Sequence, residues 1–228
     1  MTQNTLFSSK IQLRKLIKET IKAISIEEKA RQTNIVIDHL LNENKRFFKA
    51  KYVALFLSMK HEELDTQRLI ENILSEHRNK RIYVPYVDMN AKANEMVFFE
   101  LESLDKYNNE MNEDNKYNLR QFNDVNERIP INENLLDLIL VPGLAFDICD
   151  EIQEKRVSRL GRGKGYYDVF LKKIPNCYTM GIGFNEQFIP FNENMSSRKL
   201  RVPIDTQRDV LIDEYLCEKT ICNNLLNR

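Results

Sequence analysis

Residues 136–141 read L-D-L-I-L-V, and this run indicates how the rest of the chain folds. A nearly continuous aliphatic run of this length is typical of a strand buried on both faces of a parallel sheet. Similar runs predict strands at residues 52–57, 82–87, 96–101 and 178–184, and a crossover helix at 66–76 separates the first two. Strands that alternate with helices predict an α/β fold: an open, mostly parallel or mixed sheet with helices on both faces.

Two helices are predicted before the first strand. Ser8 or Ser9 can cap a helix that runs to about residue 24. Ser25, followed three residues later by Glu28, forms a capping box for a second helix, which is expected to end near residue 41.

Three segments that follow predicted strands are candidates for a binding site. They are Glu63 after the first strand, residues 142–147 after the fourth and residues 185–187 after the fifth. Ligands of open α/β sheets bind beyond the carboxyl ends of the strands. We therefore expect these segments to gather at one edge of the sheet.

Residues 159–168, R-L-G-R-G-K-G-Y-Y-D, carry the strongest indication of function. Three glycines at alternate positions permit backbone conformations that turn several N–H groups toward one anion. The interleaved Arg159, Arg162 and Lys164 are cations of the kinds that hold phosphate oxygens. A helix predicted over residues 166–174 would point its N-terminus at the same anion. The motif predicts a polyphosphate site, with Asp168 placed to hold Mg²⁺ beside it.

Two better-known glycine motifs are excluded. A Walker A loop requires Gly and then Ser or Thr at the positions that hold Ser158 and Gly165 here. A dinucleotide-binding fingerprint requires a preceding strand and a third Gly, whereas this chain has the charged residues 154–159 and Tyr166. A glycine loop with ordinary surface charges stays open as an alternative.

Length and charge limit the classes of partner. The 228 residues suit one domain, and 34 lysine and arginine residues balance 34 aspartate and glutamate residues. A net charge of zero gives no overall field to attract nucleic acid or an anionic membrane. The chain also lacks the roughly 20 consecutive apolar residues that a membrane-spanning helix needs.

The cysteines and histidines indicate no metal centre. Four cysteines form no C-x-x-C pair and have no histidine at ligand spacing, so reduced thiols are expected, as in cytoplasmic proteins. His39, His61 and His77 are interpreted as surface residues. The first 15 residues lack acidic side chains, a weak sign of an organelle-targeting peptide, but the interpretation as part of a helix and a cytoplasmic location are preferred.

Residues 105–134 are rich in Asn, Asp and Glu and poor in aliphatic side chains. This composition is too polar to bury against a core. We therefore expect a surface excursion that is mostly disordered.

The glycine motif and four further segments together resemble the 5-formyltetrahydrofolate cyclo-ligase family, also called methenyltetrahydrofolate synthetases. The further segments follow in order along the chain: K-I-Q-L-R-K at 10–15, F-L-S-M with E-L-D-T at 56–66, L-D-L-I-L-V-P-G-L-A-F-D at 136–147 and G-F-N-E-Q at 183–187. The resemblance ends at V-L-I-D-E, residues 210–214. The resemblance implies a single domain over residues 1–228.

The resemblance also implies an activity. Members close 5-formyltetrahydrofolate to 5,10-methenyltetrahydrofolate with ATP and Mg²⁺, and they release ADP and phosphate. The formyl oxygen is phosphorylated, and N10 of the folate then attacks, so the enzyme is a ligase that forms a carbon–nitrogen bond. The implied partners are the small molecules ATP and 5-formyltetrahydrofolate, bound by a monomer.

Site residues follow from positions that match the family. ATP contacts are implied for Lys10, Arg14, Arg159, Gly161, Arg162, Gly163, Lys164, Gly165, Tyr166 and Tyr167. Folate contacts are implied for Leu57, Glu63, Arg162, Gly163, Lys164, Gly165 and Tyr166. The resemblance further implies that Arg162, Lys164 and Tyr166 are catalytic and that Asp168 and Asp209 are the Mg²⁺ carboxylates.

The chain departs from the family pattern in two places. One extra residue follows Ser58, so either Glu62 or Glu63 is the folate carboxylate, and residues 148–158 are a loop insertion. Tyr117 lies in a segment that brings an aromatic residue to the folate pocket in the family. Two other functions stay open: a protein that binds nucleotide or folate without turnover, and nucleic-acid binding through the glycine-tyrosine stretch.

Overall fold

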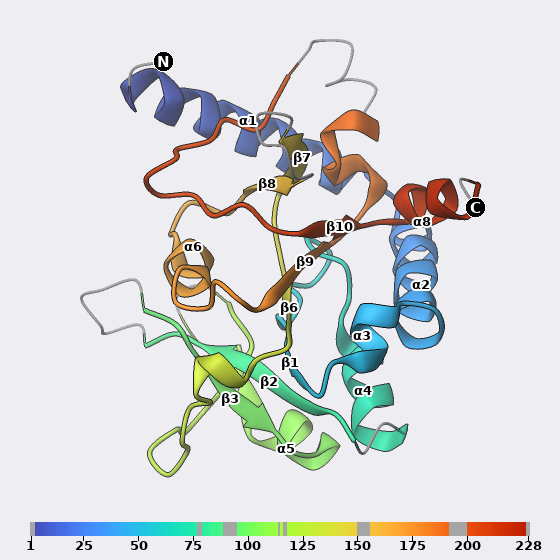
Figure 1. Cartoon of the computed structure of the whole chain (residues 1–228), viewed down its shortest axis with the longest axis vertical. Coiled ribbons are helices and arrows are strands. Elements are labelled where there is room, and N and C mark those ends of the chain that lie inside the picture. Colours follow the sequence, from blue (N-terminus) through green and yellow to red (C-terminus); the bar gives the residue numbers. More distant parts are fainter. Residues whose placement is uncertain are drawn as a thin grey trace.

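The computed structural model describes the chain except residues 1–2, 77–78, 89–94, 114, 116–117, 150–155, 192–199 and 227–228. A six-stranded sheet in the order β10-β9-β6-β1-β2-β3 runs through its centre (Figure 1). The strands are β1 (Tyr52–Ala54), β2 (Arg81–Tyr86), β3 (Val97–Leu101), β6 (Leu138–Val141), β9 (Tyr178–Ile182) and β10 (Glu214–Leu216). All neighbours are parallel except β2 and β3, so the predicted mixed, mostly parallel sheet is confirmed.

Helices cover both faces of this sheet. In Figure 1, α2, α3 and α4 lie to one side of the strands and α6 lies to the other. The helices are α1 (Gln3–Ala23), α2 (Ile26–Asn42), α3 (Lys45–Lys49), α4 (Gln67–Glu76), α5 (Leu104–Asn109), α6 (Tyr166–Leu171) and α8 (Glu218–Leu226).

The central strand β6 shows why its sequence is aliphatic throughout. Successive side chains of a strand point to opposite faces, so Leu138 and Leu140 pack into the core beneath α2 and α4. Ile139 and Val141 pack into the second core, which contains Phe170 of α6. Both faces of β6 are buried, and the sequence therefore lacks polar alternation.

The five predicted strands and the predicted crossover helix α4 all form, with ends that differ by a few residues. The cap of α2 is confirmed, because Ser25 Oγ accepts from the N–H of Glu28 over 3.1 Å. The prediction that Ser8 or Ser9 caps the first helix is wrong, since α1 begins at Gln3. Strand β10, at the edge of the sheet beyond β9, was not predicted from the sequence.

The order of the strands places a crevice between β1 and β6. From β1 the chain adds β2 on one side, whereas β6 lies on the other side and is followed outward by β9 and β10. Loops that leave neighbouring strands in opposite directions open a crevice at the carboxyl ends, where ligands of such sheets bind. The loops that leave β1 and β6 are therefore the expected walls of a site.

A separate two-stranded ladder joins β7 (Ala145–Cys149) to β8 (Arg156–Leu160). Asp147 pairs in register with Ser158, so the two ends of the proposed insertion form part of a hairpin. Asp147 is buried, and its carboxylate accepts from Arg201 over 3.0 Å and from the N–H of Val202 over 3.2 Å. The ladder leads directly into the glycine motif.

The polar segment 105–134 contributes to the core, so the prediction that it is mostly disordered and too polar to bury is wrong for its described residues. Besides the end of α5, it contains β4 (Met111–Asn112), β5 (Gln121–Phe122) and the 3-10 helix η1 (Glu133–Leu135). Tyr107, Met111 and Phe122 are buried in the main core. These three apolar side chains point inward, whereas Ile129 of the same segment is exposed. Tyr117 lies outside the described residues.

The remaining expectations concern single residues. Cys149, Cys177 and Cys217 are buried free thiols, and Cys222 is an exposed one. His61 is exposed, His39 is partly buried, and His77 lies outside the described residues. No helix of the described part of the chain is long and apolar enough to cross a membrane.

Candidate active site

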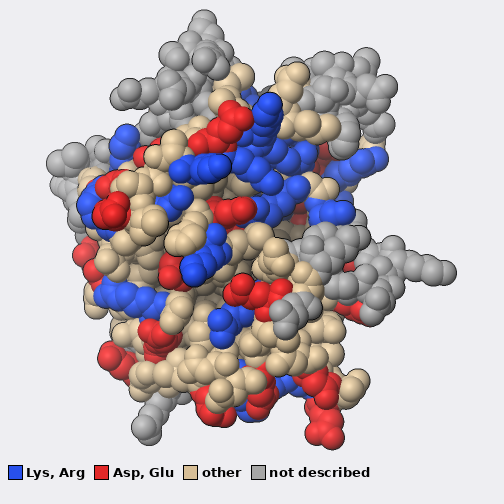
Figure 2. Space-filling model, turned by 180° about the vertical axis from the view of Figure 1, so that it is seen from behind, with Lys and Arg blue, Asp and Glu red and all other residues tan. Residues whose placement is uncertain are grey.

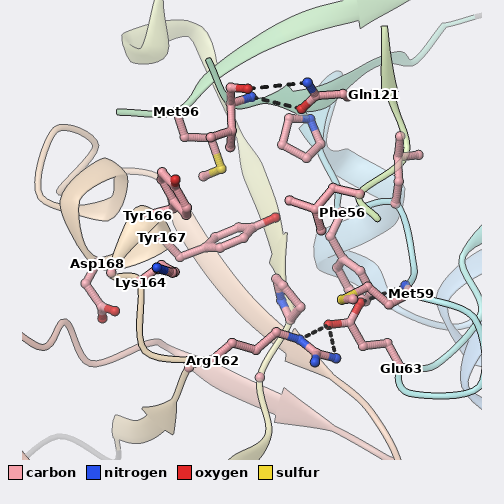
Figure 3. A pocket seen from close by; sticks show the side chains of 18 of the residues that line it. Phe56, Met59, Glu63, Met96, Gln121, Arg162, Lys164, Tyr166, Tyr167 and Asp168 are labelled. Atoms are coloured by element: carbon pink, nitrogen blue, oxygen red, sulfur yellow. Dashed lines mark hydrogen bonds and ion pairs between the residues drawn. The ribbon is translucent and has the colours of Figure 1, made fainter. Parts of the chain in front are cut away.

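A pocket of about 300 Å³ lies at the crevice between β1 and β6 (Figure 3). Its walls come from the loops after β1 and β6, the ends of β2 and β3, the glycine motif and the polar segment before and within β5. The lining residues are Phe56, Leu57, Met59, Glu63, Pro85, Val87, Met96, Leu119, Arg120, Gln121, Pro142, Gly143, Arg159, Gly161, Arg162, Lys164, Gly165, Tyr166, Tyr167 and Asp168.

One end of the pocket holds the carboxylate of Glu63. Arg162 Nε donates to Glu63 Oε1 over 3.1 Å, and the N–H of Met59 donates to Glu63 Oε2 over 3.0 Å. Burial raises the pKa of Glu63, and the charge of Arg162 opposes that shift. Glu62 is exposed and is not part of the lining, so Glu63 is the carboxylate that faces the pocket.

The glycine motif forms a tight loop that leads into α6. Gly163 and Gly165 have φ angles of +105° and +77°, which a residue with a side chain rarely adopts. Gly165 is the N-cap residue of α6, and its carbonyl accepts from the N–H of Val169 over 2.9 Å. The helix ends at Leu171, before the predicted residue 174. The glycines therefore turn the backbone as predicted, and the helix behind them is shorter than expected.

Arg159 connects strand β8 with the loop after β6 and with α6 through hydrogen bonds. Its Nη1 donates to the carbonyl of Pro142 over 3.1 Å, and its Nη2 donates to Asp168 Oδ2 over 2.9 Å. The N–H of Val210 donates to the other oxygen of Asp168 over 3.3 Å. Only 3% of the Arg159 side chain is exposed, so Arg159 holds the loop after β6 against α6.

Tyr167 crosses the pocket from the end where Lys164 and Asp168 lie toward Phe56 (Figure 3). Its hydroxyl is buried and has no hydrogen-bond partner among the described residues. Burial raises the pKa of Tyr167, which keeps the hydroxyl protonated. A buried donor without a partner is costly, so this hydroxyl is available to a ligand.

Helix α1 adds cations beside the glycine loop. Arg14 Nε donates to the carbonyl of Gly161 over 2.9 Å, and its guanidinium lies 3.4 Å from where a Cβ on Gly163 would stand. Lys10, one turn earlier, forms an ion pair with Asp209. Burial lowers the pKa of Arg14, and the carboxylates of Asp209 and Asp168 oppose that shift. Lys10 and Arg14 therefore share one helical face, as predicted, and that face meets the glycine loop.

Asp168 and Asp209 have the oxygen ligands that Mg²⁺ prefers, and both act electrostatically on Arg14. Among the described residues, no group of three or more His, Cys, Asp or Glu side chains could hold a metal ion. Two carboxylates alone cannot fill the ligand shell of Mg²⁺, so such an ion would take its other ligands from water or from a bound phosphate group.

Ten of the predicted site residues line the pocket: Leu57, Glu63, Arg159, Gly161, Arg162, Lys164, Gly165, Tyr166, Tyr167 and Asp168. The other four, Lys10, Arg14, Gly163 and Asp209, form the adjoining cluster at α1. The structure thus brings together residues from both ends of the chain.

The candidate segments at the carboxyl ends of the strands are only partly in the pocket. Of residues 142–147, Pro142 and Gly143 line the pocket, whereas the ring of Phe146 is fully buried and stacks on Tyr215 with 4.1 Å between the ring centroids. Residues Asn185–Gln187 lie behind the pocket, where Gln187 Nε2 donates to the carbonyl of Gly143 over 2.6 Å. Phe184 lines a neighbouring cavity.

Sequence reasoning missed the wall made by Pro85, Val87 and Met96. Residues 119–121 also line the pocket, and they belong to the segment of Tyr117 that the resemblance associates with the folate pocket. The side-chain amide of Gln121 accepts from the N–H of Val87 over 3.2 Å and donates to its carbonyl over 3.3 Å. Gln121 thereby pairs with the chain just after β2 as a neighbouring strand would. The position of Pro85 and Val87 at the end of a parallel strand was the available signal.

A model of the 5-formyltetrahydrofolate cyclo-ligase family matches residues 7–215. The chain belongs to this family. The matched residues include both Lys10 on α1 and Asp209, so they cover the whole site. Members of the family are ligases. The predictions of the family, the fold class and an enzyme are confirmed.

Relatives within the cyclo-ligase family come from distant organisms. A 5-formyltetrahydrofolate cyclo-ligase of Mus musculus is 31% identical to this chain. The alignment covers 96% of this chain and 98% of the Mus musculus protein. A probable cyclo-ligase of Schizosaccharomyces pombe is 29% identical and covers 78% of this chain and 79% of its own. The Arabidopsis thaliana relative, 30% identical over 75% of this chain and 60% of its own, is named mitochondrial.

Solved structures of similar proteins have the same fold. The 5,10-methenyltetrahydrofolate synthetase of Aquifex aeolicus has a TM-score of 0.60 and 28% identity, over 78% of this chain and 79% of its own. That of Mycoplasma pneumoniae has a TM-score of 0.61 and 21% identity, over 92% of this chain and 98% of its own.

Positively charged side chains cluster in one region of the surface of this cyclo-ligase family member. Figure 2 shows lysine and arginine side chains gathered on the upper half of one face, the half that α1 spans in Figure 1. Acidic side chains lie among them. A chain with a net charge of zero thus presents a cationic region to a small anionic ligand.

Proposed function

We propose that this chain closes 5-formyltetrahydrofolate to 5,10-methenyltetrahydrofolate with the use of ATP and Mg²⁺, and that it releases ADP and phosphate. One observation carries the proposal: a single pocket brings the Glu63 carboxylate together with a loop of glycines and cations. The two substrates need these opposite chemistries side by side. Membership in the cyclo-ligase family supports the assignment.

The folate half of the site lies at Glu63. A carboxylate that faces an apolar pocket accepts hydrogen bonds from the N–H groups of a pterin ring. Leu57, Phe56 and Met96 supply the apolar walls for such a ring. The unpartnered hydroxyl of Tyr167 lies in the same space and can donate to the bound substrate.

The ATP half lies at the glycine loop and α1. Backbone N–H groups around Gly163 and Gly165, together with Lys164, suit phosphate oxygens. Lys10 and Arg14 extend this cationic surface along α1. Asp168 and Asp209 would hold Mg²⁺, which neutralises phosphate charge when it is bound.

The chemistry requires activation of a poor leaving group. The formyl oxygen accepts the γ-phosphoryl group of ATP, N10 of the folate attacks the formyl carbon, and phosphate departs as the ring closes. Arg162 and Lys164 both line the pocket, and in this proposal they stabilise the charge on the transferred group. Tyr166 and Tyr167 exclude water from that group. The protein thus contributes position and charge.

A direct assay tests the proposal. Purified protein is mixed with 5-formyltetrahydrofolate and MgATP, and the near-ultraviolet absorbance of the methenyl product is followed. We expect product only when ATP is present, so omission of ATP is the control. Binding of both ligands without any product would favour the alternative of a binding protein, and a folded sample that binds neither would refute the proposal.

A further inference from the structure

Glu62 contacts a site residue although the reaction assigns it no role. Its Oε2 accepts from Arg162 Nη1 over 2.6 Å, while Nε of the same arginine donates to Glu63 over 3.1 Å. The Glu62 side chain is 52% exposed, that of Arg162 27% and that of Glu63 9%. One guanidinium therefore joins a buried carboxylate inside the pocket to an exposed carboxylate at its mouth.

The turn that carries Glu62 has a specific conformation. His61 has a φ angle of +62°, in the left-handed region that residues other than glycine adopt infrequently. The N–H groups of Glu62 and Glu63 both donate to the carbonyl of Met59, over 3.1 and 3.2 Å. Lys29 of α2 donates to the carbonyl of His61 over 2.9 Å. These hydrogen bonds fix the turn, so that the carboxylates of Glu62 and Glu63 both face Arg162 of the glycine loop.

Substrate binding creates a conflict at Glu63, if the proposed function holds. A pterin ring needs oxygens of Glu63, and Arg162 occupies one of them, Oε1, in this structure. When the substrate takes them, the partly buried guanidinium loses a partner. A buried cation without a partner carries a large desolvation penalty, which would be subtracted from the affinity for the substrate.

We propose that Glu62 is a positioning residue that retains Arg162 when the folate substrate takes over Glu63. Two carboxylates then serve two sets of donors: Glu63 accepts from the substrate, and Glu62 accepts from Arg162. The guanidinium stays at the pocket mouth, beside the place where the phosphoryl group is transferred. Glu62 and Glu63 pair with Arg162, whereas Lys10 and Arg14 contact Asp209 and Gly161, so we expect Glu62 to affect the binding of folate more than that of ATP.

Calorimetry on the full chain separates these effects. The unmodified protein, Glu62→Gln, Glu62→Asp and the exposed control Glu127→Gln are each titrated with 5-formyltetrahydrofolate and, separately, with MgATP. We expect Glu62→Gln to weaken folate binding by about tenfold, the effect of leaving the partly buried Arg162 guanidinium without its partner. Its affinity for MgATP should stay within about twofold of the unmodified protein. Glu62→Asp, which keeps the charge, should recover most of the folate affinity.

The possible results lead to different conclusions. Weaker folate binding in Glu62→Gln, with unchanged MgATP binding and rescue by Glu62→Asp, supports the role of Glu62. Unchanged folate binding in Glu62→Gln, or an equal loss for both ligands, overturns this inference and leaves the proposed function intact. If the unmodified, folded protein binds no 5-formyltetrahydrofolate, the proposed function fails and the role of Glu62 fails with it.

Discussion

The ammonium group of Lys10 forms an ion pair with the carboxylate of Asp209, 199 positions further along the chain. The same Asp209 oxygen accepts from the N–H of Asp205 over 2.7 Å. Only 11% of the Lys10 side chain and 20% of the Asp209 side chain are exposed. The pair fastens α1 to the segment before β10 and brings both ends of the chain to the glycine loop.

Lys10→Met removes one cation from the ATP half of the site. We expect the KM for ATP to rise about tenfold, because a charge-assisted hydrogen bond contributes about 1.5–3 kcal/mol. The KM for 5-formyltetrahydrofolate should change little. Steady-state kinetics with each substrate varied in turn gives both values, and Lys15→Met, an exposed change on the same helix, is the control. An equal rise in both KM values would place Lys10 outside the ATP half.

Lys164→Ala should lower turnover by about 10²-fold or more, as expected when a donor that stabilises transferred charge is lost. Lys164 lines the pocket, whereas Lys173 is exposed just after α6, so Lys173→Ala is the matched control. The absorbance assay at saturating substrates measures both variants. Turnover close to normal in Lys164→Ala would show that the assignment to the phosphoryl group is wrong.

Asp168→Asn should raise the Mg²⁺ concentration needed for half-maximal activity. The structure adds a second effect, because Asp168 is the ion partner of the buried Arg159. We expect a loss of about 1–3 kcal/mol in the free energy of unfolding, measured in urea without metal. A metal titration identical to that of the unmodified protein would remove Asp168 from the Mg²⁺ site, whatever the stability result.

Phe122→Ala tests the corrected view of the polar segment. Phe122 is 2% exposed and lies in the main core, so the substitution should reduce the free energy of unfolding by about 3–5 kcal/mol. Ile129→Ala, in the same segment but with the side chain 88% exposed, should change it by less than about 0.5 kcal/mol. Urea denaturation of the two variants makes the comparison. Equal, small losses would mean that the segment does not contribute to the core.

Arg31 makes part of the stability depend on pH. Its hydrogen bonds lower the pKa of Glu28 to about 2, and they also lower the pKa of Glu218 on α8. Because both folded-state values lie below the ordinary value of 4.5, the stabilisation is complete above about that pH. It is lost as the pH falls from there toward about 2.

Arg31→Met should therefore lower the melting temperature at pH 6 by about 1–3 °C, a small effect because the pair is largely exposed to solvent. At pH 2 the variant and the unmodified protein should differ much less. Thermal melts followed by circular dichroism at both values check this. A difference that is the same at pH 6 and pH 2 would show that these ion pairs contribute no stability.

The parts of the fold that the sequence predicts correctly are those with a strong local pattern. The run at β6 is aliphatic on both faces because cores cover both faces, and such a run has few other structures available to it. Gly163 and Gly165 likewise indicate the turn of the loop through their own backbone preferences.

Residues 105–134 show where local patterns fail. Their composition is polar, yet Tyr107, Met111 and Phe122 reach the core. Composition averages over all side chains, whereas burial depends on the direction in which a few of them point. That direction is set by packing against strands elsewhere in the chain, such as the contact of Phe122 with Phe99.

By itself, the sequence determined five strands of the central sheet, the turn at the glycine motif and the family, because each is recorded in residue types at short spacing. The tertiary structure alone decided which groups meet: Lys10 with Asp209, Arg14 with Gly161, and Arg162 with both Glu62 and Glu63. Such long-range pairs follow from the order of the strands and from the packing of α1, since a charge carries no local signal of the partner it will find.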